Sequence, residues 1–213
     1  MERIEKFHKN HEIGFSNQII KFREILENGT VIDIGSNIGL ITLAICKNIK
    51  YKSIHLFEPC EEYLNYSKEL LSNYDNLNFY NFGLSNVSEE KTLYMSKSDN
   101  IGWNTFLDKD PLQADTFTQR MEHRVCKLRK LDDFSFEQVN FIKIDVEGYE
   151  AFVIEGGFET IKKFKPHIYV EVGWGTSHPN WDYNYEVYKK LFDIGYKEVE
   201  FDNSTKDILF EPI

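Results

Sequence analysis

The 213-residue sequence predicts an α/β fold, in which a mostly parallel seven-stranded sheet carries helices on both faces and ends in an antiparallel hairpin. Two observations predict it. Short β-rich runs alternate with longer apolar segments of helical periodicity, which is the pattern of successive β-α-β units. The C-terminal end then holds two β-rich runs, YKEVEF and DILFEPI, on either side of Asn203-Ser204, which is typical of a hairpin.

The elements follow one another in a regular order. Residues 1–29 carry apolar side chains at helical intervals and end at Asn28-Gly29, so we expect an N-terminal helical segment. Parallel strands are expected at residues 30–34, 53–57, 77–82, 141–144 and 167–172. Helices are expected at residues 38–49 and 61–71, from about 147 to 157, and at 185–192.

No repeat or linker divides the sequence, so we expect a single domain over residues 1–213, which could be one part of a longer polypeptide. Residues 83–138 form one long insertion, with strands expected at 91–95 and 124–131. Long loops in compact domains are usually functional or disordered, and we expect this one to be a substrate lid.

Composition excludes several classes of protein. The net charge of −10 is opposite to that of a protein that neutralises many phosphates, so we expect no nucleic-acid partner. The basic stretch at 120–130 is either a solvated strand face or a contact for an anionic substrate group. Three distant cysteines, no apolar leader and no long apolar segment indicate a soluble, cytoplasmic protein without a membrane partner.

The most informative stretch is VIDIGSNIGLITLAI, in which a buried strand turns through glycines into a helix. The turn contains Asp33, Gly35, Ser36, Asn37 and Gly39. Glycines let a ligand approach the backbone, and the helix N-terminus offers unpaired N–H groups. A dinucleotide site such as that for NAD needs G-x-G-x-x-G, whereas here Asn37 stands where a pyrophosphate needs bare backbone and the third glycine is missing. S-adenosylmethionine brings a zwitterion and a sulfonium instead, which suit backbone groups and the Asp33 carboxylate.

A second anchor is the pair Glu58 and Pro59 at the end of the next expected strand, one β-α-β unit after Gly39. An acid at this strand tip accepts hydrogen bonds from ribose hydroxyls in doubly wound folds. The two signals together predict S-adenosylmethionine as the cofactor.

With these residues in place, the sequence resembles the FkbM-type methyltransferases. The matching motifs are VIDIGSNIG, FEP at 57–59, LDDF at 131–134, FIKIDVEGYE at 141–150 and KPHIYVEV at 165–172. The resemblance covers roughly residues 28–172 and implies a Rossmann-like class I methyltransferase fold, bound S-adenosylmethionine and O-methylation, often of a sugar hydroxyl in a glycan. By the same resemblance, Gly35, Asn37 and Gly39 match the methionine-binding turn and Glu58 the ribose-binding acid. Gly83 and Leu84, in NFGLS, match the turn beside the adenine, where the family more often has alanine in place of Gly83.

Methyl transfer to a hydroxyl needs alignment and benefits from a general base. Asp145, Glu147 and Glu171 lie at expected strand ends, and His178 follows in a loop, so these four are the catalytic candidates. We also expect Asp145 to contact the cofactor, because acids at strand tips face the methyl-donor pocket. Asp145 and Glu147 could instead cap the following helix, and we expect Glu150 to be solvated or paired with a lysine. The four candidates could gather around a divalent cation, but nothing in their spacing demands it and we assign no metal.

The aromatic residues among the loops are candidates for the acceptor site. Trp103, Asn104 and Thr105 combine a ring with hydrogen-bonding side chains, and Trp174 and Trp181 flank His178. Each group could equally be an ordinary packed loop. We therefore expect a carbohydrate or glycan acceptor, such as a deoxysugar. The alternatives are a non-sugar metabolite or peptide, methylated on oxygen or nitrogen, and a non-catalytic module that binds the cofactor or a glycan.

Overall fold

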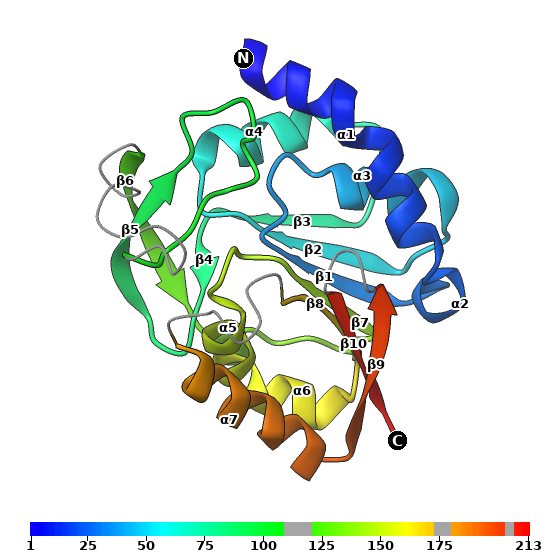
Figure 1. Ribbon diagram of the computed structural model, residues 1–213. Coiled ribbons are helices and arrows are strands. Elements are labelled where there is room, and N and C mark those ends of the chain that lie inside the picture. The colour runs from blue at the N-terminus through cyan, green and yellow to red at the C-terminus, as the bar shows by residue number, and fades with distance from the viewer. Residues whose placement is uncertain (109–120, 173–179, 203–206) are drawn as a thin grey trace.

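The computed structural model describes residues 1–108, 121–172, 180–202 and 207–213. Its central element is a seven-stranded sheet in the order β3-β2-β1-β7-β8-β10-β9 (Figure 1). These strands are β1 (Thr30–Ile34), β2 (Ser53–Phe57), β3 (Leu77–Tyr80), β7 (Phe141–Ile144), β8 (His167–Glu171), β9 (Tyr196–Asp202) and β10 (Asp207–Pro212).

The sheet has the topology that the alternating sequence pattern predicts. Strand β1 pairs in parallel with both β2 and β7, so it lies at the centre, and all five of its residues are buried. The C-terminal hairpin places β10 between β8 and β9, antiparallel to both. The expected fold class, a mostly parallel class I methyltransferase sheet with a C-terminal hairpin, is therefore confirmed.

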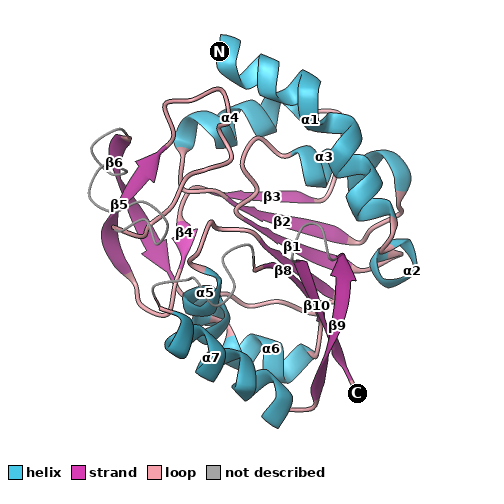
Figure 2. Cartoon of the chain, in the orientation of Figure 1, coloured by secondary structure: helices cyan, strands magenta, loops and turns pink. Residues whose placement is uncertain are grey.

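Helices cover both faces of the sheet (Figure 2). One face packs against α1 (Glu2–Ile20), α2 (Arg23–Leu26), α3 (Leu40–Asn48) and α4 (Glu61–Leu70); the other packs against α5 (Glu150–Gly156), α6 (Phe158–Phe164) and α7 (Trp181–Asp193). Successive side chains of β1 point to opposite faces of the sheet. Val31 therefore packs in the core beneath α1 to α4, and Ile32 packs in the core beneath α5 to α7.

The segment 83–138 builds a second, three-stranded sheet in the order β4-β6-β5. Its strands are β4 (Gly83–Leu84), β5 (Glu89–Met95) and β6 (Glu122–Arg129), and the short 3-10 helix η2 (Leu131–Asp133) leads back towards β7. Because β4 follows closely after β3, this sheet stands at the end of the main sheet where the parallel strands finish (Figure 1). On β6, exposed Lys127 and Arg129 alternate with buried Cys126 and Leu128, which is the pattern of a solvated strand face.

Across the described residues, every helix is too short or too polar to cross a lipid bilayer.

Candidate active site

A cavity of about 290 Å³ lies where β1, β2, β7 and β8 end. Three groups of residues line it. The turn side consists of Gly35, Ser36, Asn37, Glu58, Pro59, Gly83 and Leu84. The acid side consists of Lys143, Asp145, Glu147 and Glu171, and further residues come from α1, β10 and the loop that follows β5.

The turn after β1 has a backbone that few residues other than glycine adopt. Gly35 has φ +71°, and a Cβ added there would lie 1.9 Å from the backbone oxygen of Asp145. Asn37 is also left-handed at φ +50°, which asparagine tolerates better than most residues. The turn therefore passes directly against the tip of β7 and brings its backbone to the cavity.

Glu58 fastens this turn to the end of β2. Its Oε2 accepts the N–H of Asn37 at 2.9 Å and its Oε1 accepts the N–H of Cys60 at 2.8 Å. Burial raises the pKa of Glu58 to about 7, against the lowering effect of these two donors. The carboxyl group keeps further lone pairs for the hydroxyls of a ligand.

Ser36 supplies a buried polar group to the turn side. Its side chain is 4% exposed, it lines the cavity, and its Oγ has no hydrogen-bond partner among the described residues. Buried polar atoms are normally paired, so such an atom beside a cavity fits a polar ligand group. Together with the bare backbone of the turn and the Glu58 carboxyl, it suits an amino-acid nucleoside such as S-adenosylmethionine.

Two residues of the turn have structural roles that differ from the expectation. Asp33 is fully buried and is not among the described residues that line the cavity, so the expected contact with a cationic ligand group is corrected. It instead accepts a hydrogen bond from Thr42 Oγ1 at 2.8 Å and lies 3.6 Å from the ammonium of Lys143. Gly39 also lies outside the described lining; it caps α3 at φ +81°, where a Cβ would come within 3.0 Å of Ser67 Oγ.

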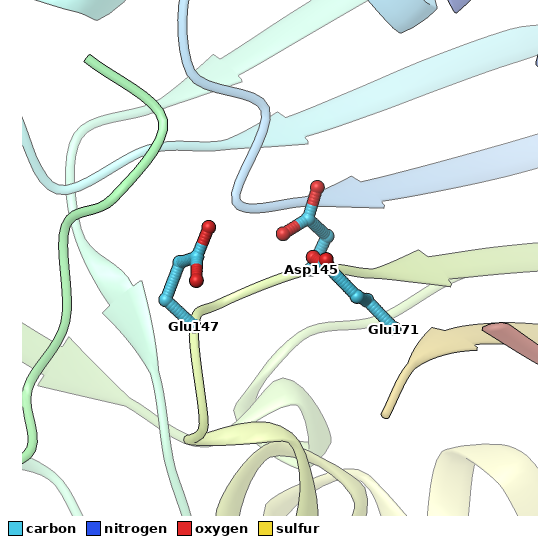
Figure 3. Close-up of side chains that lie close together, drawn as sticks. All are labelled: Asp145, Glu147 and Glu171. Atoms are coloured by element: carbon cyan, nitrogen blue, oxygen red, sulfur yellow. The ribbon is translucent and has the colours of Figure 1, made fainter. Parts of the chain in front are cut away.

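On the acid side, Asp145, Glu147 and Glu171 converge from the ends of β7 and β8 (Figure 3). One carboxylate oxygen of each lies within 4.8 Å of those of the other two. Lys143 also belongs to this group. Its Nζ is 3.2 Å from Asp145 Oδ2 and donates a hydrogen bond to the Gly35 carbonyl at 3.1 Å. One buried ammonium thus connects the acid side to the turn side.

The three carboxyls differ in their protonation. Repulsion from Asp145, together with burial, strongly raises the pKa of Glu171, whose proton is shared in a hydrogen bond with Asp145. Burial, followed by repulsion from Asp145, raises the pKa of Glu147. Burial would also raise the pKa of Asp145, but Lys143 and the hydrogen bond with Glu171 outweigh it, so the pKa of Asp145 is lowered. Near neutral pH, Asp145 carries the negative charge and Glu171 the proton.

The loop after β7 holds Glu147 in an unusual conformation. Glu147 and Gly148 both have positive φ, at +53° and +96°, and Thr105 Oγ1 donates to the Glu147 carbonyl at 2.7 Å. Helix α5 therefore begins at Glu150 rather than near Glu147, and no side chain caps it. The expectation that Glu150 is solvated or paired with lysine is wrong: it is 4% exposed, and its Oε1 accepts the N–H groups of Val146 and Gly148 at 3.2 and 3.0 Å.

Asp145, Glu147 and Glu171 are close enough to hold a divalent cation. The ammonium of Lys143 already offsets the charge of Asp145, and Glu171 holds a proton. Protein atoms and protons thus offset part of the negative charge of this group.

The expected acceptor residues fall into three classes. Trp103, 58% exposed, and Asn104 line the cavity. Thr105 is buried outside the described lining, so its expected contact with the acceptor is replaced by its hydrogen bond to the Glu147 carbonyl. Trp174 and His178 lie outside the described residues, as does the side chain of Trp181 at the start of α7.

Sequence reasoning missed Lys143 and the α1 residues of the cavity. Lys143 is 5% exposed in the apolar run FIKI, and a charge inside such a strand is the same signal that singled out Glu171. Phe7, His11, Phe15 and Gln18 also line the cavity. Their helical spacing alone predicts a packed helix, because it does not reveal which element the helix faces.

The fold is similar to those of solved methyltransferases. The methyltransferase FkbM from Methylobacillus flagellatus KT superposes with a TM-score of 0.58 at 15% identity over 86% of this chain, which spans only 43% of that protein's length. An rRNA methylase from Streptococcus thermophilus gives 0.52 at 12% identity, covering 91% of this chain and 92% of that one. SMU.1697c from Streptococcus mutans, in complex with SAH, gives 0.50 at 10% identity, covering 87% and 88%. No curated protein is significantly similar in sequence.

At these identities the structural likenesses establish the fold alone. Sequence evidence goes further, because the family model of the methyltransferase FkbM domain matches residues 33–198, more than half of the chain. The match contains the glycine turn, Glu58 and the whole acid side. The chain therefore belongs to the FkbM methyltransferase family, and by that membership it is an S-adenosylmethionine-dependent methyltransferase.

Proposed function

We propose that this protein is an O-methyltransferase that acts on a sugar hydroxyl of a glycan or glycoconjugate, for example on a deoxysugar such as rhamnose. The observation that carries the proposal is the acid side of the cavity. There an ionised Asp145, held by Lys143 and by the proton of Glu171, stands beside the glycine turn. A sugar hydroxyl is a poor nucleophile, and a carboxylate at this place supplies the base that it needs.

The turn side would hold the methyl donor. The backbone of Gly35 and Asn37 and the Oγ of Ser36 suit the amino-acid part, and Glu58 suits the ribose hydroxyls. Pro59, Gly83 and Leu84 complete the wall where the adenine is expected. S-adenosylmethionine supplies an electrophilic methyl group bound to a positively charged sulfur.

The proton and the bonds balance without a covalent enzyme intermediate. As the acceptor oxygen forms its bond to the methyl carbon, the bond from that carbon to sulfur breaks and the sulfur becomes neutral. Asp145 takes the proton that the hydroxyl loses, and Lys143 and Glu171 hold the carboxylate in place before the reaction. Glu147 would line the acceptor side in its protonated form, as a hydrogen-bond donor.

Several expectations from the sequence belong to the same proposal. The segment 83–138 would act as a substrate lid within a single domain, with Trp103 and Asn104 as its contribution to the acceptor site. The same proposal includes His178 as a catalytic group and Trp174 and Trp181 as contacts of the acceptor. The net charge of −10 favours a glycan over a nucleic acid, and the three free cysteines are in keeping with the cytoplasm.

Methyl transfer to a panel of acceptors tests the proposal. The panel contains glycosides, amines, peptides and phenols, each incubated with protein and S-adenosylmethionine labelled in the methyl group. We expect product from a glycoside, with its label resistant to mild base as an ether is. Transfer to nitrogen acceptors alone would reject the proposal.

The base is tested by Asp145→Asn, which keeps the size of the side chain and removes its charge. Loss of a general base typically lowers turnover by about 10²- to 10⁴-fold. Glu137→Ala is the matched control, because Glu137 is an acid with 89% side-chain exposure, paired at the surface with Lys52. Equal turnover of the two variants would remove Asp145 from this role.

A further inference from the structure

Helix α1 provides a wall of the cavity that the catalytic proposal does not use. Phe7, His11, Phe15 and Gln18 recur at intervals of three and four along α1, so they share one face of the helix, and all four line the cavity. We call these four residues the α1 wall. They share the cavity with Asp145 and Glu171, so a molecule bound beside these acids lies in the same cavity as the α1 wall.

The aromatic part of this wall is ordered by its own contacts. The rings of Phe7 and His11 stack with centroids 4.0 Å apart and planes 22° apart, and the ring of Phe15 lies 6.3 Å from that of His11. His11 Nδ1 is 2.8 Å from the Phe7 carbonyl, which can only accept, so Nδ1 carries a proton. In a neutral ring Nε2 is then the acceptor nitrogen. The result is a row of rings with one acceptor nitrogen on it.

A buried polar group closes the end of the row. Gln18 Nε2 donates to the Tyr169 hydroxyl at 2.7 Å and to Asp207 Oδ2 at 3.3 Å, and the Tyr169 hydroxyl donates to the same carboxylate. Tyr169 is on β8 and Asp207 begins β10, and both line the cavity. Helix α1 is thereby connected to the two strands beside the acid side.

Most of these residues lie outside the part of the chain that the family model matches, although Tyr169 lies within it. The family match runs from 33 to 198, so the whole α1 wall and Asp207 are beyond its ends. The turn side and the acid side are both inside it. The cavity thus combines residues within the family match with residues of α1 and β10 that lie outside it.

We propose that the α1 wall and the Gln18–Tyr169–Asp207 group form the acceptor-binding subsite and decide which sugar is methylated. The proposal rests on the sugar acceptor proposed above. A pyranose ring has an apolar C–H face and a rim of hydroxyls. The row of aromatic rings would pack against the apolar face of the sugar. The hydroxyl groups would form hydrogen bonds with the Gln18–Tyr169–Asp207 group and with Nε2 of His11.

The test uses residues of the α1 wall that are not themselves buried core residues. Phe7 is only 5% exposed and belongs to the main core, so we leave it unchanged. Phe15 and Gln18 are partly exposed, and Phe15→Ala and Gln18→Ala remove one ring and one end of the polar group. Ile13→Ala is the matched control, since Ile13 is on the same helix with 76% exposure and is not among the described lining residues.

Binding and turnover are measured separately on the full chain. p-Nitrophenyl α-L-rhamnoside and the corresponding glucoside, galactoside and mannoside are titrated into protein saturated with S-adenosylhomocysteine, and methyl transfer to each is assayed. We expect at least a tenfold rise in the Kd of the best glycoside and in its KM for Phe15→Ala, and a changed order of preference among the four sugars for Gln18→Ala. The Kd of S-adenosylhomocysteine should stay within twofold of wild type for all three variants.

The outcomes separate this subsite from the proposed function. Glycosides that bind wild type and the variants equally would overturn the subsite and leave the function standing. Glycosides that bind through the wall while only a non-sugar acceptor is methylated would overturn the proposed function and, with it, the role of the wall in choosing the acceptor. If no glycoside binds at millimolar concentration, the subsite is wrong as well. A parallel loss of S-adenosylhomocysteine affinity would show that the wall only supports the fold.

Discussion

The turn side and the acceptor side of the cavity are built in different ways. The turn side comes from three short segments, residues 35–37, 58–59 and 83–84, and the Glu58 carboxyl joins the first two by accepting the N–H of Asn37. The acceptor side is assembled from α1, β8, β10 and the loops after β5 and β7, which are far apart in the sequence. The site for the cofactor, which all members of a family share, can therefore be formed by short sequence motifs. The site for the acceptor, which differs between members, depends on how distant elements pack together.

The largest effect should come from breaking the turn side at Gly35. An alanine there would hold a left-handed φ at a cost of about 1–2 kcal/mol and place its Cβ 1.9 Å from the Asp145 oxygen, so the turn and the tip of β7 must move apart. We expect Gly35→Ala to lose measurable S-adenosylhomocysteine binding and to have a clearly lower Tm.

The control for this variant is Gly14→Ala within α1. A Cβ there meets nothing within 4 Å, so alanine should keep or raise the Tm through its better helix propensity, by up to about 1 kcal/mol. If Gly35→Ala behaved like Gly14→Ala, the close approach of the turn to β7 would be incorrect.

A smaller effect should follow from loosening the acid side alone. Thr105→Val keeps the shape of the side chain but removes the hydrogen bond to the Glu147 carbonyl, which costs about 1–3 kcal/mol of local stability. We expect roughly a tenfold fall in turnover, with the Kd of S-adenosylhomocysteine unchanged. Thr92→Val, at a half-buried position of β5, is the control that should leave both values alone.

The pH dependence of stability should depend on buried carboxyls of both sides. Burial raises the pKa of Glu150 to about 7 from 4.5, so its contribution to stability is full below pH 4.5 and is lost as pH rises through 7. Glu58 contributes with the same sign over the same window. Glu150→Gln keeps an oxygen for the two backbone N–H groups, so the fall in Tm between pH 5 and pH 8 should be smaller in the variant than in wild type. An unchanged fall would show that Glu150 ionises without strain.

Removal of metal should have the smallest effect. Because Lys143 and a shared proton balance the acid side, methyl transfer should stay within twofold after treatment with EDTA. A loss restored by Mg²⁺ would instead place a cation among Asp145, Glu147 and Glu171.

The same division explains what the sequence could predict. The glycine turn, Glu58, the strand-end acids and the C-terminal hairpin were all predictable, because each follows from a local pattern of period, turn residue or motif. The placement of Asp33 was not predictable, because a residue at the end of a strand can point either into the cavity or into the core. Only the contacts of Asp33 with Thr42 and Lys143 show that its side chain points into the core. The buried state of Glu150 depends on the left-handed backbone at Glu147, which no propensity indicates. The role of α1 depends on its packing across α3 and is invisible in its own sequence.

Calorimetric titration with S-adenosylhomocysteine tests the division of the cavity most directly. Wild type, Glu58→Ala and Asp145→Asn are compared at one pH. If the turn side alone binds the cofactor, Glu58→Ala should lose at least tenfold in affinity, because two backbone N–H groups and the ribose hydroxyls lose their hydrogen-bond acceptor. The affinity of Asp145→Asn should stay within threefold of wild type. Equal losses in both variants, or full affinity in Glu58→Ala, would contradict the account.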